Sequence, residues 1–332
     1  MPSDVLAPLA IAAGVALLPV LTPIGEYHLH LVILMLIWGF VYTAWSVMGR
    51  FGLVSLGHGA FMGIGAYGVT LLWNEVGLSP WLGGPIAIAA AALFAVVIGW
   101  PCFRLRITGH YFALVTLAAT EIVRLVIVAL RDLTGGSLGT TPKTALAEGP
   151  VAIAALQFAA KEVWLYIALA FWLAGVSVWR AVDRSMLRYA LEAAAQDEDA
   201  AASIGVDVTR AKLAITVLSA ALTATGGIVY AQYQLYVAPE TVSGIAVSLQ
   251  IVFAVIAGGM FVQLGPTVGA VFTLALTEGL RVAIGHTIPS LDGLIYGLLL
   301  VLFIIYMPKG ILGQALALVG RRRAARPRPA PA

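Results

Sequence analysis

The sequence predicts an all-α integral membrane protein, a polytopic bundle of about ten transmembrane helices. Apolar residues make up 61% of its 332 residues and charged residues 11%, a balance that a soluble domain of this size would not tolerate on its surface. Ten apolar stretches have the length that about 30 Å of hydrocarbon requires of a helix. They lie at 5–22, 28–48, 52–72, 82–100, 110–130, 163–180, 211–231, 244–260, 265–283 and 290–307. Short linkers and the lack of alternating ten-residue segments argue against a β-barrel.

The basic residues predict that both ends of the chain are cytoplasmic. With the N-terminus inside, 14 of the 19 Lys and Arg residues fall on that side, as the positive-inside rule requires. They are Arg50, Arg104, Arg106, Arg180, Arg184, Arg188, Arg210, Lys212, Lys309, Arg321, Arg322, Arg323, Arg326 and Arg328. We therefore divide the chain into a transmembrane domain, 1–313, and a basic tail, 314–332, that lies against anionic lipid rather than nucleic acid.

An internal repeat is visible in the apolar stretches. The segment "TLAATEIVRLVI" at 116–127 shares seven of twelve residues with "TLALTEGLRVAI" at 273–284, and "FAVVIG" at 94–99 matches "FAVIAG" at 253–258. Both pairs join stretches that are four apart, so the two copies have the same orientation in the membrane. We therefore expect a parallel repeat, with a pathway near its pseudo-twofold axis.

The segment "SLGHGAFMGIGAY" at 55–67 places four glycines, a serine and a histidine inside an apolar stretch. Glycines such as Gly59 and Gly63 let neighbouring backbones approach closely, which favours tight helix packing. Alternatively, the segment is broken or re-entrant, and Ser55 and His58 line an aqueous route, because irregular backbone at membrane depth needs protein or water beside it. The sequence leaves both interpretations open.

Several motifs resemble, in the same order, the permeases of ABC importers for branched-chain amino acids, of the LivM and LivH type, to which urea and amide permeases are related. The motifs are "GLVSLGHGAFMGIGAY" at 52–67, "LTGGSLG" at 133–139, the stretch from "AAAQDEDAAASIG" to "GGIVYA" at 193–231, "GGMFVQLGPTVGA" at 258–270 and "MPKGILG" at 307–313. The resemblance covers residues 30–313 and is closer to the LivM half of the pair. The motif at 258 departs from the family, which more often has an extra glycine and an aromatic residue there.

The resemblance implies a bacterial inner-membrane subunit that pairs with a homologous LivH-type permease, two cytoplasmic ABC ATPases and a periplasmic solute-binding protein. The sequence agrees with this expectation in one respect: no GxxxxGK[ST] phosphate loop occurs in the chain. ATP and Mg²⁺ would therefore be bound by the partner ATPases. With five dispersed histidines and one cysteine, Cys102, no metal-site spacing is present. We expect a transport subunit rather than an enzyme, with no cofactor in this chain.

The largest predicted cytoplasmic loop, 181–210, is a candidate docking element for an ATPase. Its alanine-rich segment "SMLRYALEAAAQDEDAAASIG" favours one short helix that ends near Gly205 and resembles the coupling helix of ABC permeases. The residues expected to contact the ATPase are Glu192, Gln196, Asp197, Glu198, Asp199 and Gly205. The alternative is a solvated linker helix.

Polar side chains within the apolar stretches are candidates for a translocation path. Glu121 and Arg124 are three residues apart and can pair on one helix face. Pairing is favoured because an unpaired charge in the bilayer costs at least about 2.5–3.5 kcal/mol. Glu278 and Arg281 repeat this spacing. The pairs either are structural and neutralise themselves, or they bind a zwitterionic amino acid, which needs one group of each sign. Thr216, Ser219 and Thr223 form a hydroxyl stripe that either bonds the backbone one turn earlier or lines a path. Gln250 completes the set of candidates, with Tyr42, Thr43 and Ser46 beside it.

Two functions are consistent with these observations. The favoured one is a permease subunit of an ATP-driven importer, most simply for aliphatic amino acids, in which the homologous permease completes the path. The alternative is a secondary transporter or channel for a small polar solute that uses an ion gradient. The outer loop at 131–162 helps to receive the binding protein under the first function and is an ordered cap under the second.

Overall fold

A computed structural model describes residues 3–21, 25–144, 150–284, 291–307 and 310–324. These residues form helices joined by loops, with one isolated antiparallel bridge between Thr140 and Val237. The long helices are α1 (Ser3–Leu21), α2 (Glu26–Gly49), α3 (His58–Val76), α4 (Pro80–Arg104), α5 (Gly109–Ala129), α8 (Lys161–Asp183), α11 (Val208–Gln234), α13 (Ile245–Gly258), α14 (Gly265–Ile284), α15 (Leu291–Tyr306) and α16 (Gly310–Ala324). The short ones are α6 (Arg131–Thr134), η1 (Gly136–Leu138), α7 (Pro150–Ala155), α9 (Met186–Gln196), α10 (Glu198–Ser203) and α12 (Pro239–Val242).

The helices confirm an all-helical membrane protein. Six segments of the described chain are long and apolar enough to cross a bilayer: α2, α4, α5, α8, α11 and the α12–α13 segment Pro239–Gly258. Each of the ten predicted stretches overlaps a helix. The count of about ten spans and the parallel repeat stay predictions.

Helix α2 forms the centre of the bundle, where it packs against α8, α11, α13 and α14. It is apolar around most of its circumference, as a buried helix must be, and Tyr42 and Trp45 are fully buried. Beside it, α3 packs closely on α11. A Cβ added at Gly65 would lie 2.2 Å from the carbonyl oxygen of Ala224, so the glycines of α3 let the two backbones meet.

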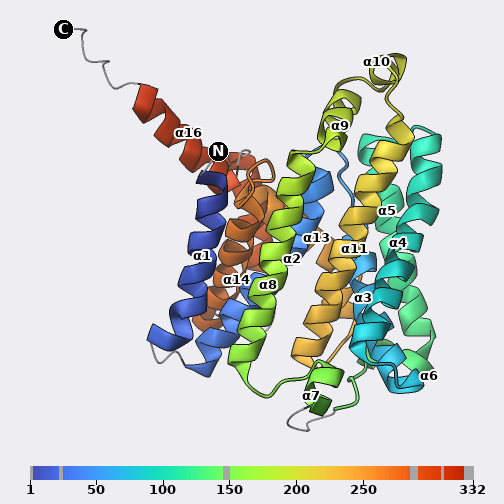
Figure 1. The fold of residues 1–332 in the computed structure, drawn as a ribbon, viewed down its shortest axis with the longest axis vertical. Coiled ribbons are helices and arrows are strands. Elements are labelled where there is room, and N and C mark those ends of the chain that lie inside the picture. The colour runs from blue at the N-terminus through green and yellow to red at the C-terminus, as the bar shows by residue number, and fades with distance from the viewer. Residues whose placement is uncertain (1–2, 22–24, 145–149, 285–290, 308–309, 325–332) are drawn as a thin grey trace.

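The bundle has two distinct ends. Helices α9 and α10 protrude from one end, and α6 and α7 lie at the other (Figure 1). The first turns of α1 and the whole of α16 lie toward the α9–α10 end (Figure 1). Both ends of the described chain are therefore on the same side of the bundle, and the assignment of that side to the cytoplasm stays a prediction.

The predicted helix at 52–72 is wrong at its start, because the chain is irregular until His58. Gly52 has φ +80°, which ends the helical path after α2. The buried backbone that follows is satisfied by side chains: Trp45 Nε1 donates to Ser55 O at 2.8 Å, and Thr120 Oγ1 donates to Leu56 O at 2.8 Å. The segment is thus irregular at its start and tightly packed against protein. An aqueous route lined by Ser55 and His58 stays a prediction.

The predicted single helix in the 181–210 loop is also wrong, because it divides into α9 and α10 at Asp197. This residue is extended, with φ −157° and ψ 117°, and its carboxylate accepts from the backbone N–H groups of Asp199 and Ala200. An aspartate that caps a new helix in this way competes with continuation of the old one. Gly205, with φ +91°, follows α10 and lies close to its predicted place at the helix end.

Two further predicted segments contain more helix than expected. The outer loop at 131–162 holds α6, η1 and α7, although residues 145–149 lie outside the described part of the chain. The predicted basic tail, 314–332, is helical through Ala324 as part of α16, and 325–332 also lie outside the described residues.

Candidate functional site

The predicted path residues of α3 and α11 come together in the bundle interior. Ser55, His58, Ser219 and Thr223 are buried, as is Thr216. His58 Nε2 and Ser219 Oγ are 2.8 Å apart, and Ser219 Oγ donates to the carbonyl oxygen of Ala44 on α2 at 2.7 Å. This interior polar contact links the three central helices α2, α3 and α11.

The two other hydroxyls of the predicted stripe on α11 bond the backbone of their own helix. Thr216 Oγ1 donates to Lys212 O at 2.8 Å, and Thr223 Oγ1 donates to Ser219 O at 2.9 Å. This is the commoner of the two uses considered for such a stripe. Gln250 reaches across to α2, where its Nε2 donates to the hydroxyl of Tyr42 at 3.1 Å.

Two glycines of the path set are sites of close approach. A Cβ added at Gly59 would lie 2.6 Å from Gly244 O, and one added at Gly63 would lie 2.8 Å from the Cβ of Ser243. Gly59 N donates to Ser248 Oγ at 3.0 Å. These glycines dock α3 onto the start of α13, and their role in a translocation path stays a prediction.

Glu121 and Arg124 form a pair on α5, as their spacing predicts, and a third residue joins them. Arg124 Nε donates to Glu121 Oε1 at 2.9 Å, and its Nη1 donates to Glu240 Oε1 on α12 at 3.3 Å. We call Glu121, Arg124 and Glu240 the Arg124 cluster. Its side chains are 29%, 26% and 73% exposed, so it lies at the surface of this chain. It ties α5 to the joint between α12 and α13.

The corresponding pair on α14 is looser. Arg281 Nη1 lies 3.6 Å from Glu278 Oε2, and the Arg281 side chain is exposed. Glu278 also accepts a hydrogen bond from the hydroxyl of Tyr27 on α2. The two predicted Glu–Arg pairs therefore both form, while only the first is bridged by a second acidic side chain.

The acidic residues of the 181–210 loop already have partners within the chain. Glu192 accepts from Arg188 Nε at 2.7 Å, and Asp199 accepts from Arg106 Nη1 at 2.7 Å. Glu198 accepts from the Lys212 ammonium, whose side chain is almost fully buried against α11. The pair of Glu192 lies within α9, whereas Glu198 and Asp199 fasten α10 to Lys212 on α11 and to Arg106 beyond α4. Contact of these carboxylates with an ATPase stays a prediction.

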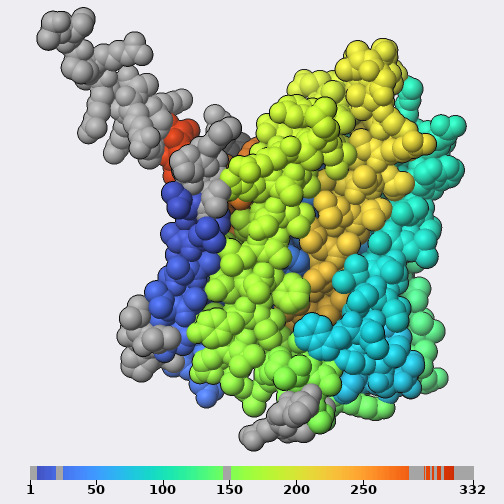
Figure 2. Space-filling model, viewed as in Figure 1, coloured from blue at the N-terminus to red at the C-terminus, as the bar shows by residue number. Residues whose placement is uncertain are grey.

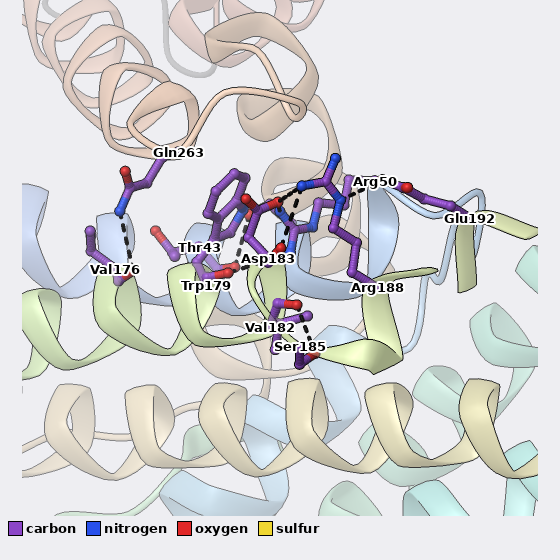
Figure 3. Close-up of polar contacts among 11 residues, drawn as sticks. Thr43, Arg50, Val176, Trp179, Val182, Asp183, Ser185, Arg188, Glu192 and Gln263 are labelled. Atoms are coloured by element: carbon purple, nitrogen blue, oxygen red, sulfur yellow. Dashed lines mark hydrogen bonds and ion pairs between the residues drawn. The ribbon is translucent and has the colours of Figure 1, made fainter. Parts of the chain in front are cut away.

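A charged cluster with one buried member, Arg50, lies where α9 meets the bundle, and it was not predicted from the sequence (Figure 3). We call Arg50, Asp183, Arg188 and Glu192 the Arg50 cluster. Arg50 Nη1 lies 3.1 Å from Asp183 Oδ1, and Arg188 Nη1 lies 3.3 Å from the same oxygen. Asp183 thus bridges the end of α2 to α9. Arg50 and Asp183 are 133 residues apart in the chain, so no local spacing could have paired them.

The guanidinium of Arg50 is enclosed by aromatic rings. Its Cζ lies 3.9 Å from the ring centroid of Trp179 and 4.8 Å from that of Phe51, within the range of cation–π attraction. Burial lowers the pKa of Arg50 to about 10, and the neighbouring Asp183 opposes this effect. Arg50 therefore remains charged at neutral pH. The hydrogen bond to Glu192 raises the pKa of Arg188.

A cavity of about 680 Å³ opens beside the Arg50 cluster. It is lined by the four cluster residues together with Phe51, Ala193, Gln196 and Phe261. Gln196, predicted to contact an ATPase, therefore lies on the wall of this cavity, at the end of α9. The space-filling view shows α9 and α10 projecting above α8 and α11 at this end (Figure 2).

The described residues contain no group of three or more His, Cys, Asp or Glu side chains that could hold a metal ion. Cys102 is buried and has a free thiol. A bundle of apolar helices with these features is a multi-pass membrane protein.

Comparison with known proteins assigns this membrane protein to a family. The model of the family described as the permease component of branched-chain amino acid transport systems matches residues 27–304. The chain belongs to this family. The match extends from the start of α2 almost to the end of α15 and therefore includes both clusters.

Two curated relatives support the assignment. Each is a high-affinity branched-chain amino acid transport system permease protein LivM, one from Salmonella typhimurium strain LT2 and one from Escherichia coli strain K12. Each is 33% identical to this chain over 284 residues, which are 80% of the chain and 65% of the relative. The alignment thus spans less than two thirds of the relatives' own length. No solved structure matched the chain significantly.

Proposed function

We propose that this chain is a transmembrane permease subunit of an ATP-driven importer for branched-chain or other aliphatic amino acids. The observation that carries the proposal is the family match across residues 27–304. The names of both curated relatives describe a permease of a high-affinity branched-chain amino acid transport system.

Energy would come from partner subunits. The chain has no phosphate-loop sequence, so two cytoplasmic ABC ATPases would bind ATP and Mg²⁺. Helices α9 and α10, which project from the bundle (Figure 2), are the docking element that this arrangement needs. Their end of the bundle is then cytoplasmic, together with both chain termini, and the α6–α7 end faces a periplasmic solute-binding protein across a bacterial inner membrane.

The translocation path would lie between this chain and a homologous permease. The interior residues His58, Ser219 and Thr223 are buried and hydrogen-bonded within the chain, which supports a packing role for them in this conformation. The Arg124 cluster is partly exposed on the outside of the bundle, where a second permease would cover it. An amino acid carries one group of each sign, and this cluster offers both.

The proposal is tested by purifying the chain with its candidate partners and measuring uptake of labelled leucine into proteoliposomes. We expect co-purification with a second permease and two ATPase subunits, and uptake that requires ATP. Changing the phosphate-loop lysine of the ATPases should abolish uptake without dispersing the complex.

A different outcome would favour the alternative function. Leucine uptake by vesicles that contain only this chain, driven by an ion gradient and insensitive to ATP, would identify a secondary transporter. If the complete complex takes up urea or a short amide instead of leucine, the proposal of an ATP-driven importer stands and only the proposed substrate is wrong.

A further inference from the structure

The Arg50 cluster connects α9 to the central helix of the bundle through an unbroken series of side-chain contacts. On α9, Arg188 holds Glu192 through Nε at 2.7 Å and Asp183 through Nη1 at 3.3 Å. Asp183 is the last residue of α8, and its Oδ1 also meets Arg50 Nη1 at 3.1 Å. Arg50 directly follows α2 as its C-cap residue. One carboxylate oxygen therefore joins α9 to α2 (Figure 3).

The side chain of Arg50 is held by contacts that it would lose if it followed a movement of α9. Its side chain is 6% exposed, it lies over the ring of Trp179, and its Nη2 donates to the Trp179 carbonyl at 3.4 Å. Its Nε is buried and has no hydrogen-bond partner among the described residues. If the guanidinium turned into the adjacent cavity it would lose its contacts with Trp179, so a displaced Asp183 either shifts the end of α2 or leaves the charge of Arg50 without its carboxylate.

Helix α2 is the element that would distribute such a displacement. It packs against α8, α11, α13 and α14, and the carbonyl of Ala44, less than two turns before Arg50, accepts from Ser219 of α11. Ser219 in turn meets His58 at the start of α3. Packed elements transmit shifts as whole bodies because a close-packed interior deforms little.

The second half of the loop is fastened elsewhere. Glu198 of α10 pairs with Lys212 on α11, and this ammonium is buried as well. The break at Asp197 separates two sets of ion pairs. Those of α9 reach the end of α2 through Asp183, whereas that of Glu198 on α10 reaches α11, on which α9 also packs.

We propose that Arg50 is a positioning residue that couples α9 to α2, so that a movement imposed on α9 from outside the bundle reaches the central helix through Asp183. The inference rests on the proposed function, in which the body that moves α9 is an ATPase. Arg50 itself contacts neither the transported solute nor the ATPase. A series of contacts shows energetic coupling only when the effects of substituting its residues are not additive.

The test uses the complete importer in proteoliposomes and measures ATP hydrolysis and leucine uptake in the same vesicles. The variants are Arg50→Gln, Arg188→Gln and the two combined, with Arg50→Lys as the conservative change. Arg184→Gln is the matched control, because Arg184 lies next to Asp183, is exposed, and takes part in none of the ion pairs of the described residues.

In Arg50→Gln we expect the ATP hydrolysed per leucine to rise about tenfold, within the usual range of coupling between sites, while hydrolysis itself continues. Arg188→Gln should act in the same direction, and the double variant should be no worse than Arg50→Gln, because both substitutions interrupt one link. Arg50→Lys should recover part of the coupling, and Arg184→Gln should match the wild type.

Three results would overturn the inference. Unchanged ATP use per leucine in Arg50→Gln would refute it, as would uptake and hydrolysis that fall in proportion, which is the signature of a structural role. Additive effects in the double variant would show two independent sites. If Arg50→Gln does not assemble, Arg188→Gln and Glu192→Gln, both at a half-exposed position, decide between the same outcomes. A wild-type complex without ATP-driven uptake refutes the proposed function itself, together with this inference.

Discussion

The two charged clusters of this protein use similar side chains in different surroundings. In the Arg124 cluster, Arg124 is 26% exposed and its far partner Glu240 is 73% exposed. In the Arg50 cluster, Arg50 is 6% exposed and contacts the rings of Trp179 and Phe51, while its partner Asp183 is 34% exposed. Exposed ion pairs contribute about 0–1 kcal/mol to stability, whereas the loss of one partner from a buried pair costs about 3–5 kcal/mol. We therefore expect the Arg50 cluster to contribute more to stability than the Arg124 cluster.

Removing the shared carboxylate of the Arg50 cluster should have the largest effect. In Asp183→Ala, Arg50 remains buried without a counter-charge, so we expect the free energy of unfolding to fall by about 3 kcal/mol. Equilibrium unfolding in detergent or bicelles measures this. Arg50→Met combined with Asp183→Ala removes both charges and should restore part of the loss. If Asp183→Ala lowers the free energy of unfolding by less than about 1 kcal/mol, the Arg50–Asp183 pair behaves as an exposed ion pair.

Disturbing the packing beneath the Arg124 cluster should have an intermediate effect. Gly244 has φ +93°, and a Cβ added there would lie 2.8 Å from Arg124 Cδ. Gly244→Ala should therefore cost about 2 kcal/mol through backbone strain and displacement of the arginine. Gly77→Ala is the control, because Gly77 has φ +70° but no atom within 4 Å of an added Cβ. Equal costs for the two variants in the same unfolding assay would show that contact with Arg124 contributes nothing.

Neutralising the exposed carboxylate should have the smallest effect on stability. Arg124 keeps its contact with Glu121 in Glu240→Gln, so we expect a change within about 0.5 kcal/mol, and a smaller one at high salt. If Glu240→Gln leaves stability unchanged but lowers leucine uptake by the complex, the Arg124 cluster acts on the solute or on a partner. A loss of stability as large as that of Asp183→Ala would remove the contrast between the two clusters.

The sequence predicted ion pairs only between residues that are close together in the chain. Glu121 and Arg124 share a helix face by their spacing alone, and the structure confirms the pair. The partners of Glu198 and of Arg50 come from other helices, 14 and 133 residues away, and neither was predicted. One helix was predicted at 181–210 because helix propensity is summed over a window of residues, and the many alanines dominate that sum. The sum does not show that Asp197 caps a second helix.

The sequence by itself determined the class of the molecule and its local pairs. An apolar content of 61% requires a hydrocarbon solvent, and unsatisfied backbone in that solvent requires helices. Only the tertiary structure decided that α2 lies at the centre and that Asp183 joins its end to α9. The physical reason is that the helical period brings residues three or four apart onto one face of the same helix, which the sequence shows. Contacts between helices depend instead on how their whole apolar surfaces pack.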